Sequence, residues 1–210
     1  MVASVPGRRA GVTEAGERPR ARRGAFLHDA GGAAAVEFAL VCLPFFGLVA
    51  AILQICLIMW ATQNLEERLQ RAVRTIYTGT FQGANANPPD STTVLNSLRT
   101  TMCGATTSRI PTAFDCSAIK LNVVLSNSFA AGTAPTPLDP KTKDWATGFG
   151  STYSCAKPGA IVVVTAAVKY PVAFGFLNFG APTFTDGARL LQSTAVFRTE
   201  PYDTSSGSPC

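Results

Sequence analysis

Phe38-Ala-Leu-Val-Cys-Leu-Pro-Phe-Phe-Gly-Leu-Val-Ala-Ala-Ile-Leu-Gln-Ile-Cys-Leu-Ile-Met-Trp-Ala61 is a stretch without a single charged side chain. As a helix it would be roughly 36 Å long, slightly more than the ~30 Å hydrocarbon layer of a bilayer. A cleaved secretory signal has an apolar core of only about 7–15 residues. A small domain also cannot bury a helix that is apolar on every face. We therefore predict a transmembrane helix over residues 33–61.

The segment before this span, residues 1–32, is rich in Arg, Gly and Ala and has no apolar periodicity, so we predict a disordered leader. Its basic residues outnumber its acidic ones, Glu14, Glu17 and Asp29. The basic residues are Arg8, Arg9, Arg18, Arg20, Arg22 and Arg23. The positive-inside rule places such a leader in the cytoplasm. Nucleic-acid binding is not indicated, because only Phe26 interleaves an aromatic ring with these charges.

After the span the apolar residues follow one helical face, Leu65, Leu69, Val73 and Ile76, so we predict an amphipathic continuation of the helix over residues 62–82. It should run to about Tyr77 and stop at Gly79 and Gly83.

Residues 83–203 are predicted to form an α+β domain outside the cytoplasm, followed by a flexible tail at 204–210. Asp90 or Ser91 can cap a second helix, whose apolar face is Val94, Leu95, Leu98 and Met102. Three runs rich in Val, Thr and Ile predict strands of a small antiparallel sheet, at Ile119–Leu125, Ile161–Tyr170 and Leu190–Arg198. A long Pro- and Gly-containing loop separates the first two strands and is expected on the surface. The fold class is therefore α+β, with a long N-terminal helix and about three strands.

Four cysteines, Cys103, Cys116, Cys155 and Cys210, follow the span, as expected for a domain in an oxidising compartment. We favour a Cys103–Cys116 disulfide, which would close the loop before the first strand. A Cys155–Cys210 disulfide is the second expectation, with two free thiols or an intermolecular bridge as the alternatives. Cys42 and Cys56 lie within the span and are expected to be packing residues.

Catalytic patterns are missing from the sequence. The only histidine, His28, is in the leader, and no CxxC, HExxH, GxSxG or glycine-rich phosphate loop occurs. Asp115, Asp139, Asp144 and Asp186 lack the alternating spacing of a calcium loop. We therefore predict no enzyme activity, no cofactor, no metal and no small-molecule substrate.

Glu37 is a lone carboxylate at the start of the span, in Gly31-Gly-Ala-Ala-Ala-Val-Glu-Phe-Ala-Leu40. A charged group at the bilayer centre costs about 2.5–3.5 kcal/mol on insertion scales, so acids in membranes are often functional. A purely structural explanation is that Glu37 lies at the interface, where the helix dipole favours a negative charge by a few tenths of a kcal/mol. The residue alone does not decide between these interpretations.

The residues around Glu37 resemble the processing site of Flp-type prepilins, in which a membrane peptidase cuts after the glycine. Val36-Glu37-Phe38-Ala39-Leu40-Val41 with Pro44 is similar to the TadE/TadG-like proteins of the tight-adherence pilus system. The segment Val196-Phe-Arg-Thr-Glu-Pro-Tyr202 is similar to the closing strand of TadE-like proteins.

This resemblance implies cleavage between Gly32 and Ala33, with Glu37 and Phe38 as the processing and assembly motif. By analogy with type IV pilins, Glu37 would pair with the new α-amino group of a neighbouring subunit. Pro44 should kink the helix near Leu40.

The resemblance further implies a pseudopilin or minor pilin-like component of a Flp-type pilus or related secretion machine, in the bacterial inner membrane with its domain in the periplasm. Its expected partners are membrane lipid, a prepilin peptidase, other pilin or pseudopilin subunits and the pilus assembly platform. The alternative is an uncleaved single-pass anchor whose outer domain binds a partner or the cell wall.

Overall fold

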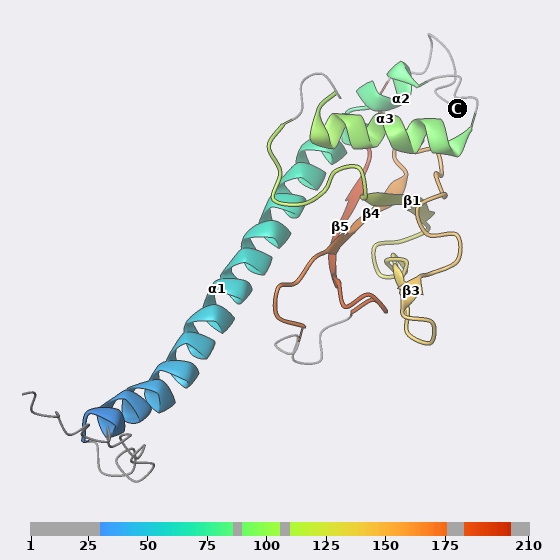
Figure 1. Cartoon of the computed structure of the whole chain (residues 1–210). Coiled ribbons are helices and arrows are strands. Elements are labelled where there is room, and N and C mark those ends of the chain that lie inside the picture. Colours follow the sequence, from blue (N-terminus) through green and yellow to red (C-terminus); the bar gives the residue numbers. More distant parts are fainter. Residues whose placement is uncertain (1–29, 86–89, 106–109, 176–182, 203–210) are drawn as a thin grey trace, which may run out of the picture. The chain divides into compact units, whose positions relative to one another are not determined.

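The computed structural model describes residues 30–85, 90–105, 110–175 and 183–202 (Figure 1). The chain forms two compact units, Met1–Phe46 and Gly47–Cys210. The helices are α1 (Ala30–Tyr77), α2 (Thr80–Ala84) and α3 (Ser91–Cys103). The strands are β1 (Lys120–Ser126), β2 (Leu138–Asp139), β3 (Asp144–Trp145), β4 (Ile161–Tyr170) and β5 (Arg189–Arg198). The predicted α+β class is confirmed. The leader to residue 29, the tail from residue 203 and Cys210 lie outside the described residues.

The part of α1 in the second unit contributes one face to the hydrophobic core. Its buried side chains recur every three or four residues, which places them on one stripe of a helix. They are Ile58, Ala61, Leu65, Leu69, Ala72, Val73 and Ile76. Charged residues such as Glu66, Glu67 and Arg71 occupy other faces and are exposed. The amphipathic pattern therefore seats the second half of α1 in the core of the α+β unit (residues 47–210).

The three long strands form an antiparallel sheet in the order β1-β4-β5. Each predicted strand matches an observed strand to within one residue at either end. In the central strand β4, residues Val162, Val164, Ala166 and Val168 share one face and join the same core as α1 and α3. The sheet is thus covered on this face by the two helices.

The other face of β4 is also buried, at Val163, Thr165 and Ala167. The long excursion between β1 and β4 reaches this face, since a Cβ on Gly132 would lie 3.5 Å from Val163 Cγ2. The same excursion carries the small hairpin β2–β3, which the sequence pattern did not predict. The excursion is therefore a packed layer over the second face of the sheet.

A compact aromatic and cationic cluster holds the excursion in place. Trp145 of β3 stacks on Phe149 with ring centroids 5.9 Å apart and contacts Phe184 at 4.9 Å. Lys120 Nζ lies 4.9 Å from the centre of the Trp145 ring, and Lys169 Nζ lies 4.2 Å from that of Phe184. Cation–π contacts of this kind contribute about 0.5–1 kcal/mol when exposed.

Helix α3 begins where the sequence predicts. Asp90 is its N-cap, and its Oδ1 accepts a hydrogen bond of 2.6 Å from the Thr93 backbone N–H. At the other end, the predicted Cys103–Cys116 disulfide is present, with Cα atoms 6.1 Å apart. The disulfide ties the C-terminus of α3 to the segment that leads into β1.

Helix α1 ends at Tyr77, as predicted, and the rest of the region 62–82 contains a break at Gly79, one of the two glycines expected to stop the helix, followed by the short helix α2. Gly79 causes the break because its φ of 76° is in the left-handed region. The residues after β5 pack here: Glu200 N–H donates to Tyr77 O at 3.0 Å, and the Tyr202 hydroxyl donates to Ala156 O. We call these contacts, of Glu200 with Tyr77 and of Tyr202 with Gly79 and Ala156, the C-terminal clasp.

Gly79→Ala should lower the free energy of unfolding by at least about 1 kcal/mol, because a non-glycine residue is disfavoured at positive φ. In addition, the new Cβ would clash with the ring of Tyr202. Thermal and urea unfolding of the full chain in detergent, followed by circular dichroism, measures the effect. Gly83→Ala is the matched control, since a Cβ there meets nothing within 4 Å. Equal stability of the two variants would contradict the role given to the clasp.

Candidate functional site

The residues predicted for processing and assembly lie at the start of α1, in the first unit. Helix α1 begins at Ala30, so Gly32 and Ala33 are in its first turn, and Glu37 and Phe38 follow one turn later. All residues from 32 to 40 are exposed. A Cβ on Gly32 would meet nothing within 4 Å. The Gly32–Ala33 peptide bond is therefore accessible on the surface of this unit.

Glu37 is isolated from other charges along the helix. The next charged residue in sequence is Glu66, and Glu37 makes no hydrogen bond or ion pair with any residue in the described part of the chain. Ala33 precedes it by four residues, so both side chains lie on one face of α1. An exposed acid without a partner, on an apolar helix, is available to a charge on another molecule.

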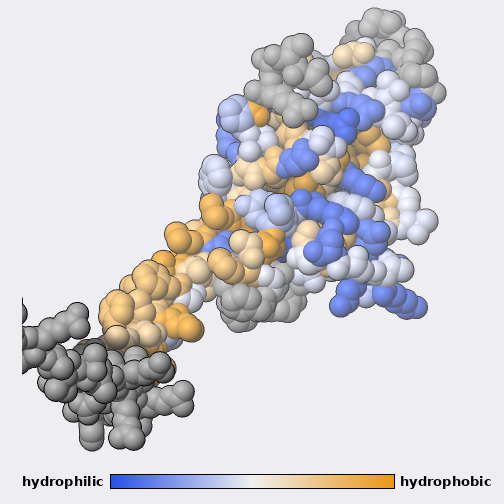
Figure 2. Space-filling model, in the orientation of Figure 1, coloured by the Kyte–Doolittle hydropathy of each residue, from blue (hydrophilic) through white to orange (hydrophobic). Residues whose placement is uncertain are grey.

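The surface of α1 around and after Glu37 is apolar and largely exposed. Most of its large side chains from Val36 to Trp60 are more than half exposed, and Figure 2 shows apolar residues gathered along this helix. Among the described residues, there is one helix that is long and apolar enough to cross a membrane, Gly32–Tyr77. An exposed apolar helix is compatible with a lipid bilayer, because a helix makes its backbone hydrogen bonds within itself and leaves none unpaired in the hydrocarbon. The helix is therefore a candidate single-pass membrane anchor.

Pro44 lies inside α1, and the helix is continuous through it from Ala30 to Tyr77. The kink near Leu40 stays a prediction. Cys42 and Cys56 on the same helix are free thiols, Cys56 being exposed. Cys155 is engaged in a disulfide, but its predicted partner Cys210 lies outside the described residues, so that pairing also stays a prediction.

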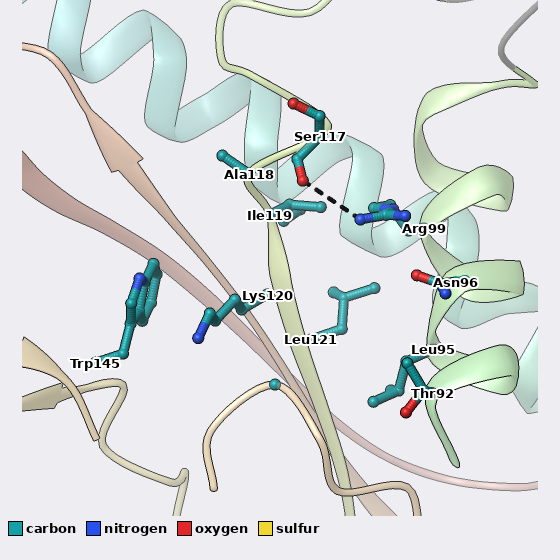
Figure 3. A pocket seen from close by; sticks show the side chains of 11 residues that line it. Thr92, Leu95, Asn96, Arg99, Ser117, Ala118, Ile119, Lys120, Leu121 and Trp145 are labelled. Carbon is teal, nitrogen blue, oxygen red and sulfur yellow. Dashed lines mark hydrogen bonds between the residues drawn. The ribbon is translucent and has the colours of Figure 1, made fainter. Parts of the chain in front are cut away.

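A groove of about 410 Å³ lies between α3 and the start of β1 in the α+β unit. Figure 3 shows Arg99 directed from α3 toward Ser117, whose carbonyl oxygen accepts a hydrogen bond from Arg99 Nη1 at 3.3 Å. Lys120 and Trp145 lie on the other side of β1. Among the described residues that line the groove, two are cations, Arg99 and Lys120, and none is a carboxylate, a histidine or a cysteine. The groove therefore lacks an acid–base pair.

The acids considered for calcium have partners within the protein. Asp144 and Asp186 each lie 3.4 Å from Lys169 Nζ. The Trp145 backbone N–H holds the pKa of Asp144 below its usual value, and the Ala188 backbone N–H does the same for the pKa of Asp186, with Lys169 adding to both. Asp115 Oδ1 accepts from Ser117 N and Oγ at 2.8 and 2.7 Å. In the described ranges, no group of three or more potential ligands is placed to hold a metal ion.

One polar contact on α1 was not foreseen from the sequence. The Gln54 side chain is only 7% exposed and bonds both backbone groups of Phe174, accepting from N at 2.9 Å and donating to O at 3.2 Å. These residues are 120 positions apart. Gln54 is the only side-chain amide in the uncharged run 38–61, which was the available signal, but the run does not reveal its partner.

In a comparison with known protein families, residues 32–74 match the family of TadE-like proteins. The matched range contains Gly32, Ala33, Glu37, Phe38 and Pro44, and it ends three residues before the end of α1. No curated protein and no solved structure matches the chain. The resemblance predicted from the start of the span is therefore confirmed on the helix, and the sheet and the C-terminal clasp lie outside the matched range.

Proposed function

We propose, from the TadE-like segment at residues 32–74, that this chain is a pseudopilin or minor pilin-like component of a tight-adherence pilus or a related secretion machine. The TadE-like segment by itself indicates involvement in a Tad pilus-related system. The observation that carries the finer proposal is the arrangement at the start of α1. An accessible Gly32–Ala33 bond lies one turn before Glu37, which is the only acid in the first part of α1, residues 30–61.

The first proposed step is cleavage by a prepilin peptidase after Gly32. A peptidase needs a locally extended substrate, so the first turn of α1 must open. Glycine eases this opening because it costs about 1 kcal/mol relative to alanine in a helix. The exposure of Gly32 and the empty space around its Cα support access by another protein. In this step the chain is a substrate of the peptidase and does no catalysis.

The second step is assembly through α1. Cleavage frees an α-amino group on Ala33, and an amine in lipid is costly unless an opposite charge neutralises it. Glu37 of a neighbouring subunit would pair with that amine and set the register between the two helices. The small side chains of Ala33, Ala34, Ala35 and Ala39 support close approach of helices.

The proposed topology places the leader in the cytoplasm and the α+β unit outside it. The arginine-rich leader supports this orientation through the positive-inside rule. The Cys103–Cys116 disulfide supports it independently, because such bonds persist in oxidising compartments. The proposed location is the bacterial inner membrane, with the domain in the periplasm.

Gly32→Ala should leave membrane insertion unchanged and block maturation. N-terminal mass spectrometry of membrane-extracted protein is the measurement: we expect the parent chain to start at Ala33 and the variant to retain its leader. Gly47→Ala is the matched control, since a Cβ at either glycine meets nothing within 4 Å. A parent chain that starts at Met1 or Val2 would refute processing and favour the uncleaved anchor that binds a partner or the cell wall.

Glu37→Ala should insert and be cleaved normally but lose incorporation into the assembly by at least about tenfold, because the amine of the neighbouring subunit is left unpaired. Copurification with pilus subunits after cross-linking measures incorporation. Glu66→Ala is the control, because Glu66 is an exposed acid on the same helix, beyond the apolar span. If both variants incorporate like the parent chain, Glu37 has no assembly role.

A further inference from the structure

A second groove, of about 340 Å³ and apolar, lies in the α+β unit between α1 and the end of β4 with the residues that follow it, 170–174. Helix α1 contributes Leu53, Leu57 and Ile58, and the segment contributes Pro171, Val172 and Phe174. Leu53, Leu57 and Phe174 are 58%, 52% and 40% exposed. In water these neighbouring side chains would form an apolar patch of the kind that marks an interaction surface.

The segment is fixed to the helix at a defined level by Gln54. Its amide satisfies both the N–H and the carbonyl group of Phe174, at 2.9 and 3.2 Å. Irregular backbone is tolerated at membrane depth only where its polar groups find partners in the protein. The Gln54 amide provides these partners for the backbone N–H and carbonyl group of Phe174.

The level of Gln54 is inside the uncharged run of α1. Gln54 precedes Ala61, the last residue of the run, by about 10 Å at 1.5 Å per residue. The uncharged run is only about 6 Å longer than the hydrocarbon layer, so Gln54 lies below the outer boundary even if the boundary is several residues before Ala61. Trp60, 58% exposed, has the position and amphipathic ring typical of a residue at the membrane interface.

The chemistry of the segment agrees with that depth. No charged residue occurs in the sequence between Lys169 and Asp186, and Tyr170 and Phe174 provide aromatic rings at its start. Lys169, which precedes the segment, pairs with Asp144 and Asp186, and Arg189 of β5 is the strand partner of Tyr170. The segment therefore carries no charge that would have to be removed from water.

We propose that residues 170–174 form a second membrane contact, inserted beside α1 into the outer leaflet, with lipid acyl chains filling the groove. This proposal rests on the membrane topology of the proposed function. Lipid is the occupant because the groove is continuous with the exposed apolar surface of α1, including Ile55, Met59 and Trp60, which faces lipid in that topology. The α+β unit is then held at the membrane surface at two places.

Fluorescence quenching by brominated phospholipids tests this insertion in the full chain reconstituted into phospholipid nanodiscs. The native tryptophans Trp60 and Trp145 are replaced by Phe, and a single tryptophan is introduced by Phe174→Trp or, as a second variant, by Ala173→Trp. The aqueous control is Phe129→Trp in the same background, because Phe129 is a 59% exposed aromatic on the excursion. A chain with only Trp145→Phe, which retains Trp60, is the reference for the membrane span.

We expect the tryptophans at positions 173 and 174 to lose as much fluorescence to the brominated acyl chains as Trp60 does. The tryptophan at position 129 should lose none. Quenching of Trp60 without quenching at 173 and 174 would overturn the insertion and leave the proposed function intact. Shielding of 173 and 174 from both bromolipid and aqueous acrylamide would also overturn it, by showing that protein covers the groove. An unquenched Trp60 would overturn the span and the proposed function together.

Discussion

The structure depends on one helix that changes environment along its length. Up to about Trp60 the side chains of α1 are apolar around the helix and mostly exposed, whereas from Ile58 to Ile76 its buried residues form one stripe in the core. Burial contributes about 25 cal/mol per Å² of apolar surface, so this stripe is a main source of stability for the α+β unit. The sheet cannot be separated from α1 without exposing that stripe. The domain is therefore built onto the same helix that is the candidate membrane anchor.

Polar contacts at both ends of the stripe fix the sheet to the helix. At the far end, the C-terminal clasp joins Glu200 and Tyr202 to the end of α1, and Gln82 Nε2 donates to Ile76 O and Ala156 O at 3.0 and 3.1 Å. At the near end, Gln54 holds Phe174. Leaving a buried polar group unpaired costs about 1–3 kcal/mol, so these contacts oppose sliding of the sheet along the helix.

Features with a long periodic signal were predictable from the sequence. The uncharged run, the apolar stripe of α3, the Val-rich run of β4 and the run of β5 each extend over several residues, and the structure has a helix or strand at each. The short helix α2 and the two-residue strands β2 and β3 have no such period, so pattern analysis missed them. The packing of the excursion on Val163 was also not foreseen, because Trp145, Phe149 and Phe184 meet only in the folded chain.

For the candidate site, local sequence was informative at Gly32 and Glu37 because their spacing within one helix sets their geometry. It was uninformative for Gln54 and Phe174, since the contact between them depends on how β4 ends relative to α1. The disulfide was an intermediate case: a short loop favoured Cys103–Cys116, but the bond could be established only once α3 and β1 were placed. Long-range contacts of single side chains are thus the part of this molecule that sequence patterns leave open.

The central claim, that α1 passes from lipid into the core of the domain, is tested most directly by labelling single cysteines with a membrane-impermeant maleimide in spheroplasts. The sites are the native Cys56, which is exposed on the apolar half of α1, and Gln70→Cys, which is exposed on the domain half. We predict that Gln70→Cys reacts at once and that Cys56 reacts only after detergent dissolves the membrane. Equal labelling of Cys56 in intact spheroplasts would place that half of the helix in water and contradict the account.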